Sequence, residues 1–269
     1  MVNRKRLDPT ESAAALFGAK LRKLRDQAGL SQAELAKELD YSHDTISKVE
    51  TASQAPSPEF AKRADDYFET DEQFQELQPL AAKEGIPVFF RPYADLEWTA
   101  TAVRVYEPFV VTGLFQTQDY AREVLRPGQR ASKLEQSIST RMGRQGILTR
   151  EDPPWIVVLI QETAVLKVVG NQDTTKDQLG KLLELVAEPH INVRVVPKDA
   201  QVFPSGGFTL FSRDDEPDIG YVEGAAIGGR VVELSSQVGE LRKLWDMIGT
   251  AAMTDLASEA LIREVWENL

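Results

Sequence analysis

The chain contains no cysteine and only two histidines among its 269 residues. Without cysteine it can form neither a disulfide nor a thiolate nucleophile, which fits a cytoplasmic protein. A metal site built from histidine and cysteine is excluded for the same reason, because such sites need three or four of these ligands. We therefore expect neither a bound metal nor a cofactor.

Long apolar runs are absent as well. No stretch approaches the ~18 apolar residues that a membrane span needs. The basic residues 1–7 are not followed by an apolar segment, so a secretory signal is not expected. The remaining composition, 42% hydrophobic and 27% charged, is typical of a globular protein, and its length suits two domains better than one.

An excess of positive charge is the third absence. The formal net charge is −11, which argues against a protein that coats nucleic acid non-specifically. The acidity is unevenly spread. Residues 1–70 hold 11 basic and 12 acidic side chains, whereas the other 199 residues hold 20 and 30. A nearly neutral segment followed by an acidic remainder indicates two parts with different tasks.

The N-terminal segment is predicted to form four short helices, because apolar residues recur in it at helical spacing. Gly29 ends the first helix, and Ser31 with Glu34 forms a capping box for the second. Ser42 caps the third, and either Ser57 or Pro58 opens the fourth. The residues expected to line the buried faces are Phe17, Leu21, Leu24, Ala28, Leu35, Ala36, Leu39, Ile46, Val49, Phe60, Ala61, Ala64 and Phe68.

The remainder is predicted to mix helices and strands. A polar helical connector is expected over 71–85. Further helices are expected over 94–106, 117–125, 131–149, 174–187, 235–249 and 254–267. Runs rich in β-branched residues predict strands over 155–161, 191–196, 208–212, 219–223 and 230–234, with 213–218 as an acidic hairpin turn. The predicted domains are therefore residues 1–70, a connector 71–85, and an α+β domain over 86–269. Its sheet is expected to be mostly antiparallel or mixed, with amphipathic helices at the C-terminus.

Two short helices joined by a tight turn form the geometry of a helix-turn-helix, whose second helix lies in the major groove of DNA. Residues 31–50 closely resemble the helix-turn-helix of phage Cro and repressor proteins, the XRE type with its all-α, lambda-repressor-like fold. Asp40 stands in the turn where that family usually has glycine, so it must adopt a positive φ. A second departure is Thr51-Ala52, where glycine commonly ends the third helix.

Geometry assigns candidate roles at the third helix. Its first turns should point at base edges, so His43, Asp44, Ser47 and Lys48 are the expected base-reading residues. An aspartate carboxylate can accept a hydrogen bond from cytosine N4, and a lysine can reach guanine O6 and N7. For each of these residues the alternative is a solvated helix face.

Contacts to the DNA backbone are expected from Ser42 and Thr45. The basic residues Arg4, Lys5 and Arg6 are expected either to enter the minor groove or to form a disordered start with weak non-specific affinity.

The resemblance to the Cro and repressor family implies two further roles. Gln32, at the start of the second helix, matches a residue that family members use on a phosphate. Arg25 and Glu50 match a pair that forms a buried salt bridge in this family, so both are expected to be structural.

The acidic remainder carries no convincing catalytic constellation. The carboxylates between 214 and 218 are read as a solvated hairpin tip, and 205–207 lacks a histidine partner for a nucleophilic serine. The glycine-rich stretch 224–229 has no lysine for phosphate binding, so a turn is the better interpretation. An enzyme is therefore not expected.

Residues from about 86 to 265 resemble an actinobacterial domain of unknown function, DUF5753, that commonly follows this type of helix-turn-helix. The motifs that carry the resemblance lie at 107–122, 141–148, 161–166, 178–183, 195–197, 207–210 and 221–223. The family includes WhiJ-type developmental regulators and antitoxin-like regulators, which are often paired with a small acidic protein. Within these motifs Arg141, Arg144, Gln116 and Tyr120 are candidates for a partner or ligand surface. Alternatively, the arginines pair with acids of the same domain and the segment before Tyr120 is a structural helix entry.

The sequence as a whole predicts a dimeric, sequence-specific transcriptional regulator, in the first instance a repressor, that binds a double-stranded operator. Its half-sites would lie one helical turn apart. A small acidic protein or a ligand bound by the second domain would shift operator affinity. The alternative is an antitoxin that neutralises a small toxin encoded beside it and regulates its own operon.

Overall fold

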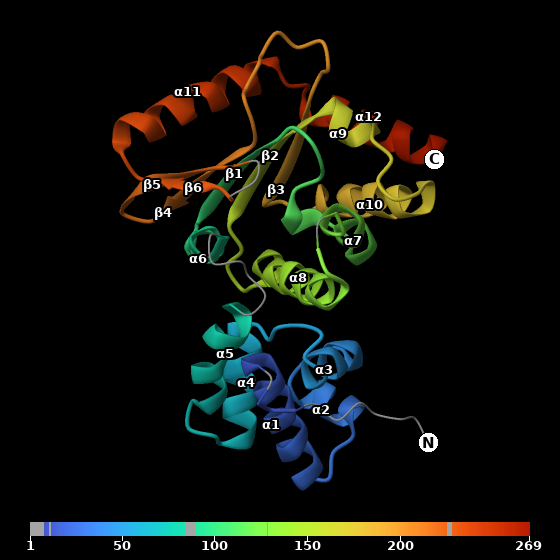
Figure 1. Ribbon diagram of the computed structural model, residues 1–269, viewed down its shortest axis with the longest axis vertical. Helices are drawn as coiled ribbons and strands as arrows, with labels where there is room; N and C mark the ends of the chain where they lie inside the picture. Colours follow the sequence, from blue (N-terminus) through green and yellow to red (C-terminus); the bar gives the residue numbers. More distant parts are fainter. Residues whose placement is uncertain (1–7, 11, 84–89, 128, 225–227) are drawn as a thin grey trace. The chain divides into compact units, whose positions relative to one another are not determined.

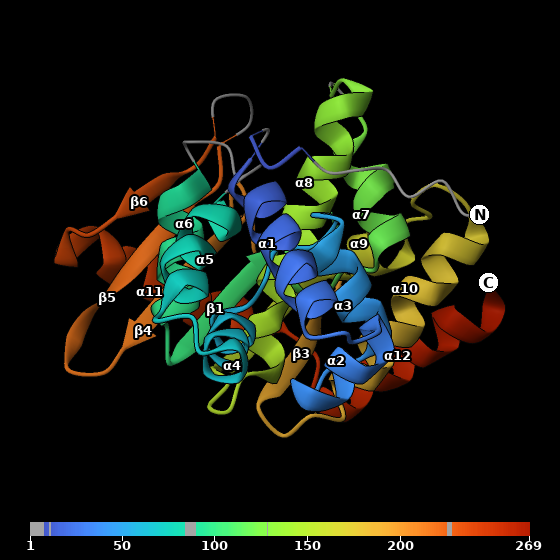
Figure 2. The ribbon, with the colours of Figure 1, turned by 90° about the horizontal axis from the view of Figure 1, so that it is seen from below.

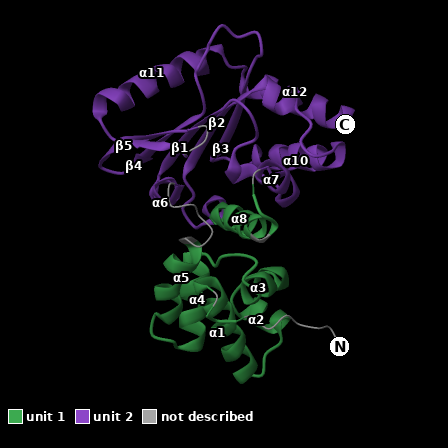
Figure 3. Ribbon diagram, viewed as in Figure 1, with its two compact units in different colours: residues 1–86, 128–146 green, residues 87–127, 147–269 purple. Residues whose placement is uncertain are grey.

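The structure is a computed structural model that describes residues 8–10, 12–83, 90–127, 129–224 and 228–269 (Figure 1). The chain divides into two compact units (Figure 3). We call residues 1–86 with 128–146 the head, and residues 87–127 with 147–269 the body. The head is helical, and the body contains a mixed sheet, which confirms the predicted fold class.

Six helices of the head are described. They are α1 (Ala13–Gln27), α2 (Gln32–Glu38), α3 (His43–Glu50), α4 (Pro58–Phe68), α5 (Gln73–Lys83) and α8 (Ala131–Arg144). The predicted caps are confirmed: Ser31 and Glu34 form the capping box of α2, Ser42 accepts from Thr45 N, and Ser57 accepts from Phe60 N. These caps satisfy backbone donors that a helix start otherwise leaves without partners.

The head extends beyond the four predicted helices. Within the predicted polar connector, Gln73–Lys83 forms α5, which packs against α1 and α4. Phe74 anchors α5 in the core of the head, where its ring lies 4.8 Å from that of Phe17. Residues 128–146, which the sequence places with the second domain, also belong to this unit.

The body is built around a six-stranded sheet in the order β3-β2-β1-β4-β5-β6 (Figure 2). The strands β1 (Ala102–Glu107), β2 (Trp155–Gln161) and β3 (Ile191–Val196) are parallel. The strands β4 (Phe208–Arg213), β5 (Glu216–Val222) and β6 (Arg230–Val232) continue it in antiparallel pairs. The predicted hairpin turn is shorter than expected, because β4 ends at Arg213 and β5 begins at Glu216.

Both faces of the sheet are covered. Helix α11 (Ser235–Ala251) packs on one face, over a cluster that includes Tyr106, Leu159 and Phe208. The other face carries the larger core and is covered by α6, α7, α10 and α12 (Figure 1). Bounds of these helices are Arg91–Thr99, Gln118–Leu125, Gln172–Leu185 and Asp255–Asn268, and shorter turns are η2 (Gly113–Phe115), η3 (Gln145–Thr149) and α9 (Glu162–Leu166).

One predicted helix of the body was wrong in part. Residues 94–106 were expected to be helical, but only Arg91–Thr99 forms α6, and Ala102–Glu107 is the central strand β1. Val103 and Val105 alternate into the core, which is the pattern of a strand. Two residues separate the helix from the strand, so one apolar period runs into the other.

The edge of β3 is covered by the connection between α11 and α12. Met253 N donates to Val195 O at 2.8 Å, and Ser258 Oγ, in the first turn of α12, accepts from Val195 N at 2.9 Å. Arg194 Nε donates to Met253 O at 2.8 Å. These bonds satisfy strand groups that an open edge would offer to another chain.

Candidate nucleic-acid interface

Helices α2 and α3 meet at the corner that the sequence predicts. Leu35, Ile46 and Val49 are buried where the two helices pack, and Ala36 is buried beside them. Asp40 has φ 59°, which confirms the positive φ expected in the turn. Because Asp40 lacks the freedom of glycine, this turn holds some backbone strain.

Arg63 of helix α4 stabilises the turn between α2 and α3. Arg63 Nη1 donates to Leu39 O at 3.0 Å and to Asp40 Oδ2 at 3.2 Å, and its guanidinium lies over the ring of Tyr41. Hydrogen bonds to Glu59 and then to Asp40 raise the pKa of Arg63 above a value at which arginine is already always charged. The turn between α2 and α3 is therefore fixed by a third helix.

Helix α1 approaches α3 closely. A Cβ placed on Gly18 would lie 2.5 Å from Val49 O, a distance that no side chain tolerates. Glycine is therefore required at this crossing, which brings α1 against the last turn of α3.

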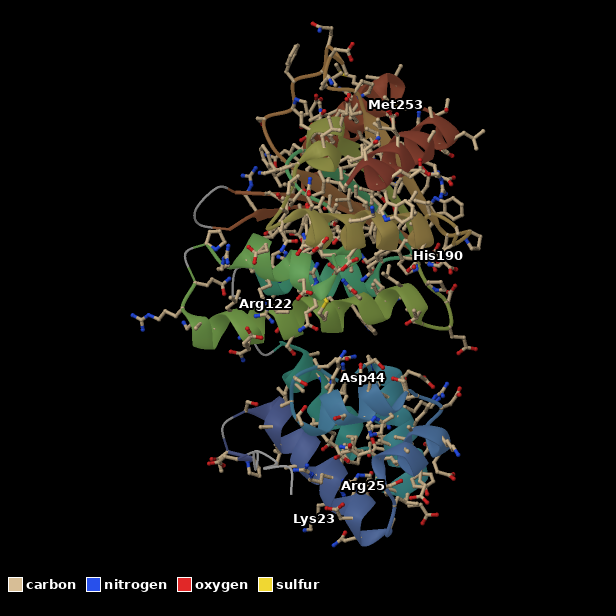
Figure 4. All side chains as sticks on the ribbon, turned by 90° about the vertical axis from the view of Figure 1, so that its right-hand side faces the viewer. Lys23, Arg25, Asp44, Arg122, His190 and Met253 are labelled. Carbon is tan, nitrogen blue, oxygen red and sulfur yellow. The ribbon has the colours of Figure 1, made fainter. Side chains whose placement is uncertain are left out.

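The predicted ion pair between α1 and α3 is present. Arg25 Nε and Nη2 donate to the two carboxylate oxygens of Glu50, the second at 3.1 Å, and both side chains are buried (Figure 4). Gln32 Nε2 donates to Glu50 Oε2 at 2.7 Å. An amide nitrogen carries two hydrogens, so Gln32 can bind a phosphate with the second while Glu50 orients it.

The predicted base-reading residues lie on one stretch of α3. His43 and Asp44 are exposed in its first turn, and Ser47 and Lys48 are half-exposed one turn later. Lys48 Nζ lies 2.8 Å from Asp44 Oδ2, so the two candidates pair with each other at i and i+4. Both residues were predicted from the sequence, but their pairing was not.

The two predicted backbone-binding hydroxyls lie at the start of α3. Ser42 Oγ and Thr45 Oγ1 are 2.9 Å apart and form a hydrogen bond. Arg4, Lys5 and Arg6 lie outside the described residues.

The loop after α3 is tied to the last turn of that helix. Thr51 Oγ1 donates to Ser47 O at 2.7 Å, and the N–H groups of Ser53 and Gln54 donate to Lys48 O at 2.9 and 3.3 Å. Ala52 takes φ 52°, the left-handed conformation for which the family has glycine nearby. These contacts were missed because a Thr-Ala-Ser-Gln stretch carries no distinctive loop motif.

The four residues predicted to form a partner or ligand surface do not lie together, because two belong to the body and two to the head. Gln116 and Tyr120 belong to the body and are each 1% exposed. Gln116 Nε2 donates to Val111 O at 2.6 Å, and Tyr120 Oη accepts from Val111 N at 3.3 Å. These two side chains therefore support the core rather than a contact surface, which corrects the prediction. Thr117 caps α7 by accepting from Tyr120 N, as expected for a structural helix entry.

The basic members of that predicted surface lie elsewhere. Arg141 and Arg144 occupy the last turn of α8, which belongs to the head. Cations in this position are favourable because a helix C-terminus carries partial negative charge.

Metal sites and membrane-spanning helices are not found among the described residues. Among the described residues, no group of three or more His, Asp or Glu side chains is placed to hold a metal ion. Within the same residues, none of the helices combines the length and apolar composition that crossing a membrane requires.

The corner of α2 and α3, with its caps and buried ion pair, defines the class of the head as a helix-turn-helix. Comparison with known families agrees: the family described as "Helix-turn-helix domain" matches residues 16–77. A second family, "Domain of unknown function (DUF5753)", matches residues 90–264, well over half of the chain. The chain belongs to this DUF5753 family and carries a helix-turn-helix before the shared domain. Neither the curated proteins nor the solved structures yielded a significant match to it.

Proposed function

We propose that this protein is a sequence-specific DNA-binding transcriptional regulator, acting as a dimeric repressor. The observation that carries the proposal is the first turn of α3. It presents His43 and Asp44 to solvent, while Ile46, Val49 and Glu50 fix the opposite side of the same helix in the head. A rigid helix with one exposed polar face is what major-groove reading requires.

The caps add to this interface. The starts of α2 and α3 both begin with a serine cap, and helix N-termini favour anionic groups such as phosphates. Gln32, Ser42 and Thr45 stand at these two starts, so we assign them to the DNA backbone. His43, Asp44, Ser47 and Lys48 are assigned to the bases.

The body supplies the regulatory half of the proposal. We propose that it binds a small protein or a ligand and that the chain works as a homodimer in the cytoplasm on half-sites one helical turn apart. The regulatory role of the body is supported by its own apolar core, which is separate from the core of the head. The DUF5753 family itself does not name what this domain binds.

The experiment is a selection followed by a binding titration. The full chain selects duplexes from a random library of about 30 base pairs, enough for two half-sites one turn apart. The variant Lys48→Ala is then compared with Lys243→Ala, an exposed lysine of the body paired with Glu240 at 2.7 Å. We expect Lys48→Ala to lose about tenfold or more in affinity for the selected site, as base contacts are worth ~1–3 kcal/mol. If the two variants bind the selected duplex with equal affinity, Lys48 of α3 does not contact the bases.

The sign of regulation needs a cellular test. Deletion of the gene should raise expression from a promoter that contains the selected site. If deletion instead kills the cell unless the neighbouring reading frame is also deleted, the protein is an antitoxin and DNA binding is its means of autoregulation.

A further inference from the structure

Two glycines near the end of α8, Gly143 in its last turn and Gly146 in the following turn η3, lie against the segment between α3 and α4. A Cβ placed on Gly143 would lie 3.3 Å from Cβ of Ala55 and 3.7 Å from its N atom. A Cβ on Gly146 would lie 3.8 Å from Cβ of Ser57. The end of α8 therefore touches the α3–α4 loop directly, and the approach is close at Gly143, where an added Cβ would be tighter than an ordinary contact.

Hydrogen bonds tie this loop to α3. The N–H groups of Ser53 and Gln54 donate to Lys48 O, and Ser53 Oγ donates to the same oxygen at 3.1 Å. At its other end, Pro56 O accepts from the buried Gln78 of α5 at 3.0 Å. A displacement of Ala55 therefore reaches the turn of α3 that holds Lys48.

The other side of this contact is covalently joined to the body. Gly146 is the last residue of the head, and Ile147 after it is fully buried in the main core of the body with Leu148. Consecutive Cα atoms are held about 3.8 Å apart. A rearrangement that moves Ile147 must therefore move Gly146 as well.

We propose that α8 is a regulatory clasp that lowers DNA affinity while it is docked on the α3–α4 loop. The inference rests on the proposed function, in which α3 reads DNA, and names how that reading is controlled. Within the head, Figure 4 shows Asp44 on the side of helices α1–α5 that is turned towards α8, and Figure 1 shows α3 beneath α8. A major groove about 12 Å wide admits one helix about 10–12 Å across. A second helix docked beside α3 on that side obstructs the approach of the groove wall.

The contact with the loop is suited to opening. Gly143 and Gly146 meet Ala55 and Ser57 there, and these small residues bury little apolar surface, whereas α8 packs separately against α5. Among the described residues, none from α8 belongs to the apolar cluster of the head. A partner or ligand that rearranges the body core around Ile147 can therefore shift the population from the docked to the released state.

A disulfide tests the docked state directly. The natural chain has no cysteine, so the pair Ala55→Cys and Gly143→Cys is unique in the full-length protein. The Cβ separation of 3.3 Å is close to the ~3.5–4.5 Å range of disulfides. The probe is the duplex selected by the unmodified chain. We expect the oxidised pair to bind it about tenfold more weakly than the same protein after reduction, a typical size for coupling between sites. The single variant Ala55→Cys should show no difference between oxidised and reduced forms.

A bulky side chain at the contact between α8 and the loop tests the released state. Gly143→Gln should push α8 off the loop and bind the duplex about tenfold more tightly than the natural chain. Gly239→Gln is the matched control, because Gly239 lies in α11 with nothing within 4 Å of its added Cβ. Circular dichroism confirms that each variant keeps its helices.

The outcomes separate this inference from the proposed function. Equal binding by the oxidised and reduced pair overturns the clasp, and tighter binding after oxidation shows that docked α8 assists DNA instead. If the natural chain enriches no duplex from the library, the proposed function fails first and the clasp fails with it.

Discussion

Arg25 and Glu50 join the first helix of the head to the last residue of α3 through two hydrogen bonds. Arg25 Nη2 donates to Glu50 Oε2 at 3.1 Å, and Nε donates to Oε1. The hydrogen bond to Glu50 raises the pKa of Arg25 despite burial, so the guanidinium stays charged. The orientation of α3 therefore depends on a charged pair as well as on apolar packing.

Breaking this pair should destabilise the head strongly. Arg25→Ala leaves the carboxylate of Glu50, which is 0% exposed, without its main partner. We expect a loss of about 3–5 kcal/mol in the free energy of unfolding. Urea unfolding followed by circular dichroism measures it. Tryptophan fluorescence reports the body separately, because Trp98, Trp155, Trp245 and Trp266 all lie there.

The control is the double variant Arg25→Met with Glu50→Leu. Replacing both charges by apolar side chains removes the uncompensated charge, so most of the lost stability should return. A single Arg25→Ala variant as stable as the natural chain would show that the pair contributes nothing.

The turn before α3 gives a second stability prediction. Asp40 has φ 59°, a conformation that costs most non-glycine residues about 1–2 kcal/mol. Asp40→Gly should therefore be more stable than Asp40→Ala by about 1 kcal/mol. At Lys62, an exposed position inside α4, the order should reverse by a similar amount, since alanine favours a helix. Thermal unfolding of the four variants compares the two differences, and the same order at both positions would refute strain in the turn.

Local patterns explain which features the sequence could predict. The caps by Ser31, Ser42 and Ser57 depend on residues three positions apart, so the sequence shows them directly. The strands over 155–161 and 191–196 have the predicted bounds, because buried parallel strands are continuous β-branched runs.

Relations between distant residues were not predictable in this way. Gly143 meets Ala55 across almost ninety positions, and no local pattern marks either residue as a contact. The Arg25–Glu50 pair was expected only from the family resemblance. Tyr120 was read as a candidate surface residue because its motif is distinctive, yet the motif serves the core. A single sequence cannot separate a structural motif from a binding motif.

Asp65 links the end of α4 to the start of α5 and gives the head a pH dependence. Burial raises the pKa of its carboxyl, but hydrogen bonds from Thr70 and from the N–H groups of Phe74 and Gln75 outweigh it. The pKa therefore lies below its ordinary value. Ionised Asp65 stabilises the head above the unfolded pKa of ~3.9, and this contribution is lost as pH falls through the lowered folded pKa.

Asp65→Asn should make the stability of the head depend less on pH in the acidic range. The natural chain should lose head stability more steeply than the variant as pH falls from about 5 toward 2, where the carboxylate binds a proton. At neutral pH the variant should be less stable by about 1–3 kcal/mol, because an amide is a weaker acceptor for the two backbone donors. Urea midpoints from circular dichroism at several pH values test both parts. Parallel curves for the two proteins would mean that Asp65 does not titrate with unfolding.

The pairing of Asp44 with Lys48 leads to a prediction about DNA specificity. The side chain of Asp44 is 70% exposed, and its Oδ2 lies 2.8 Å from Lys48 Nζ. One negative charge therefore stands on the face of α3 that we propose contacts DNA. Asp44→Asn removes a repulsion from the phosphates and frees the lysine to contact them. We expect affinity for random duplex to rise and the salt dependence of binding to steepen by about 0.9 in log–log slope, the value for one added phosphate contact.

Discrimination should change in the opposite direction. If the carboxylate accepts a hydrogen bond from cytosine N4, its loss costs ~1–3 kcal/mol of preference at that base pair, so the selected site and random duplex draw closer in affinity. Asp246→Asn, at an exposed position of α11, is the matched control and should leave both affinities unchanged. If Asp44→Asn retains the full preference for the selected site, Asp44 serves only to hold Lys48, and the base contact belongs to His43, Ser47 or Lys48.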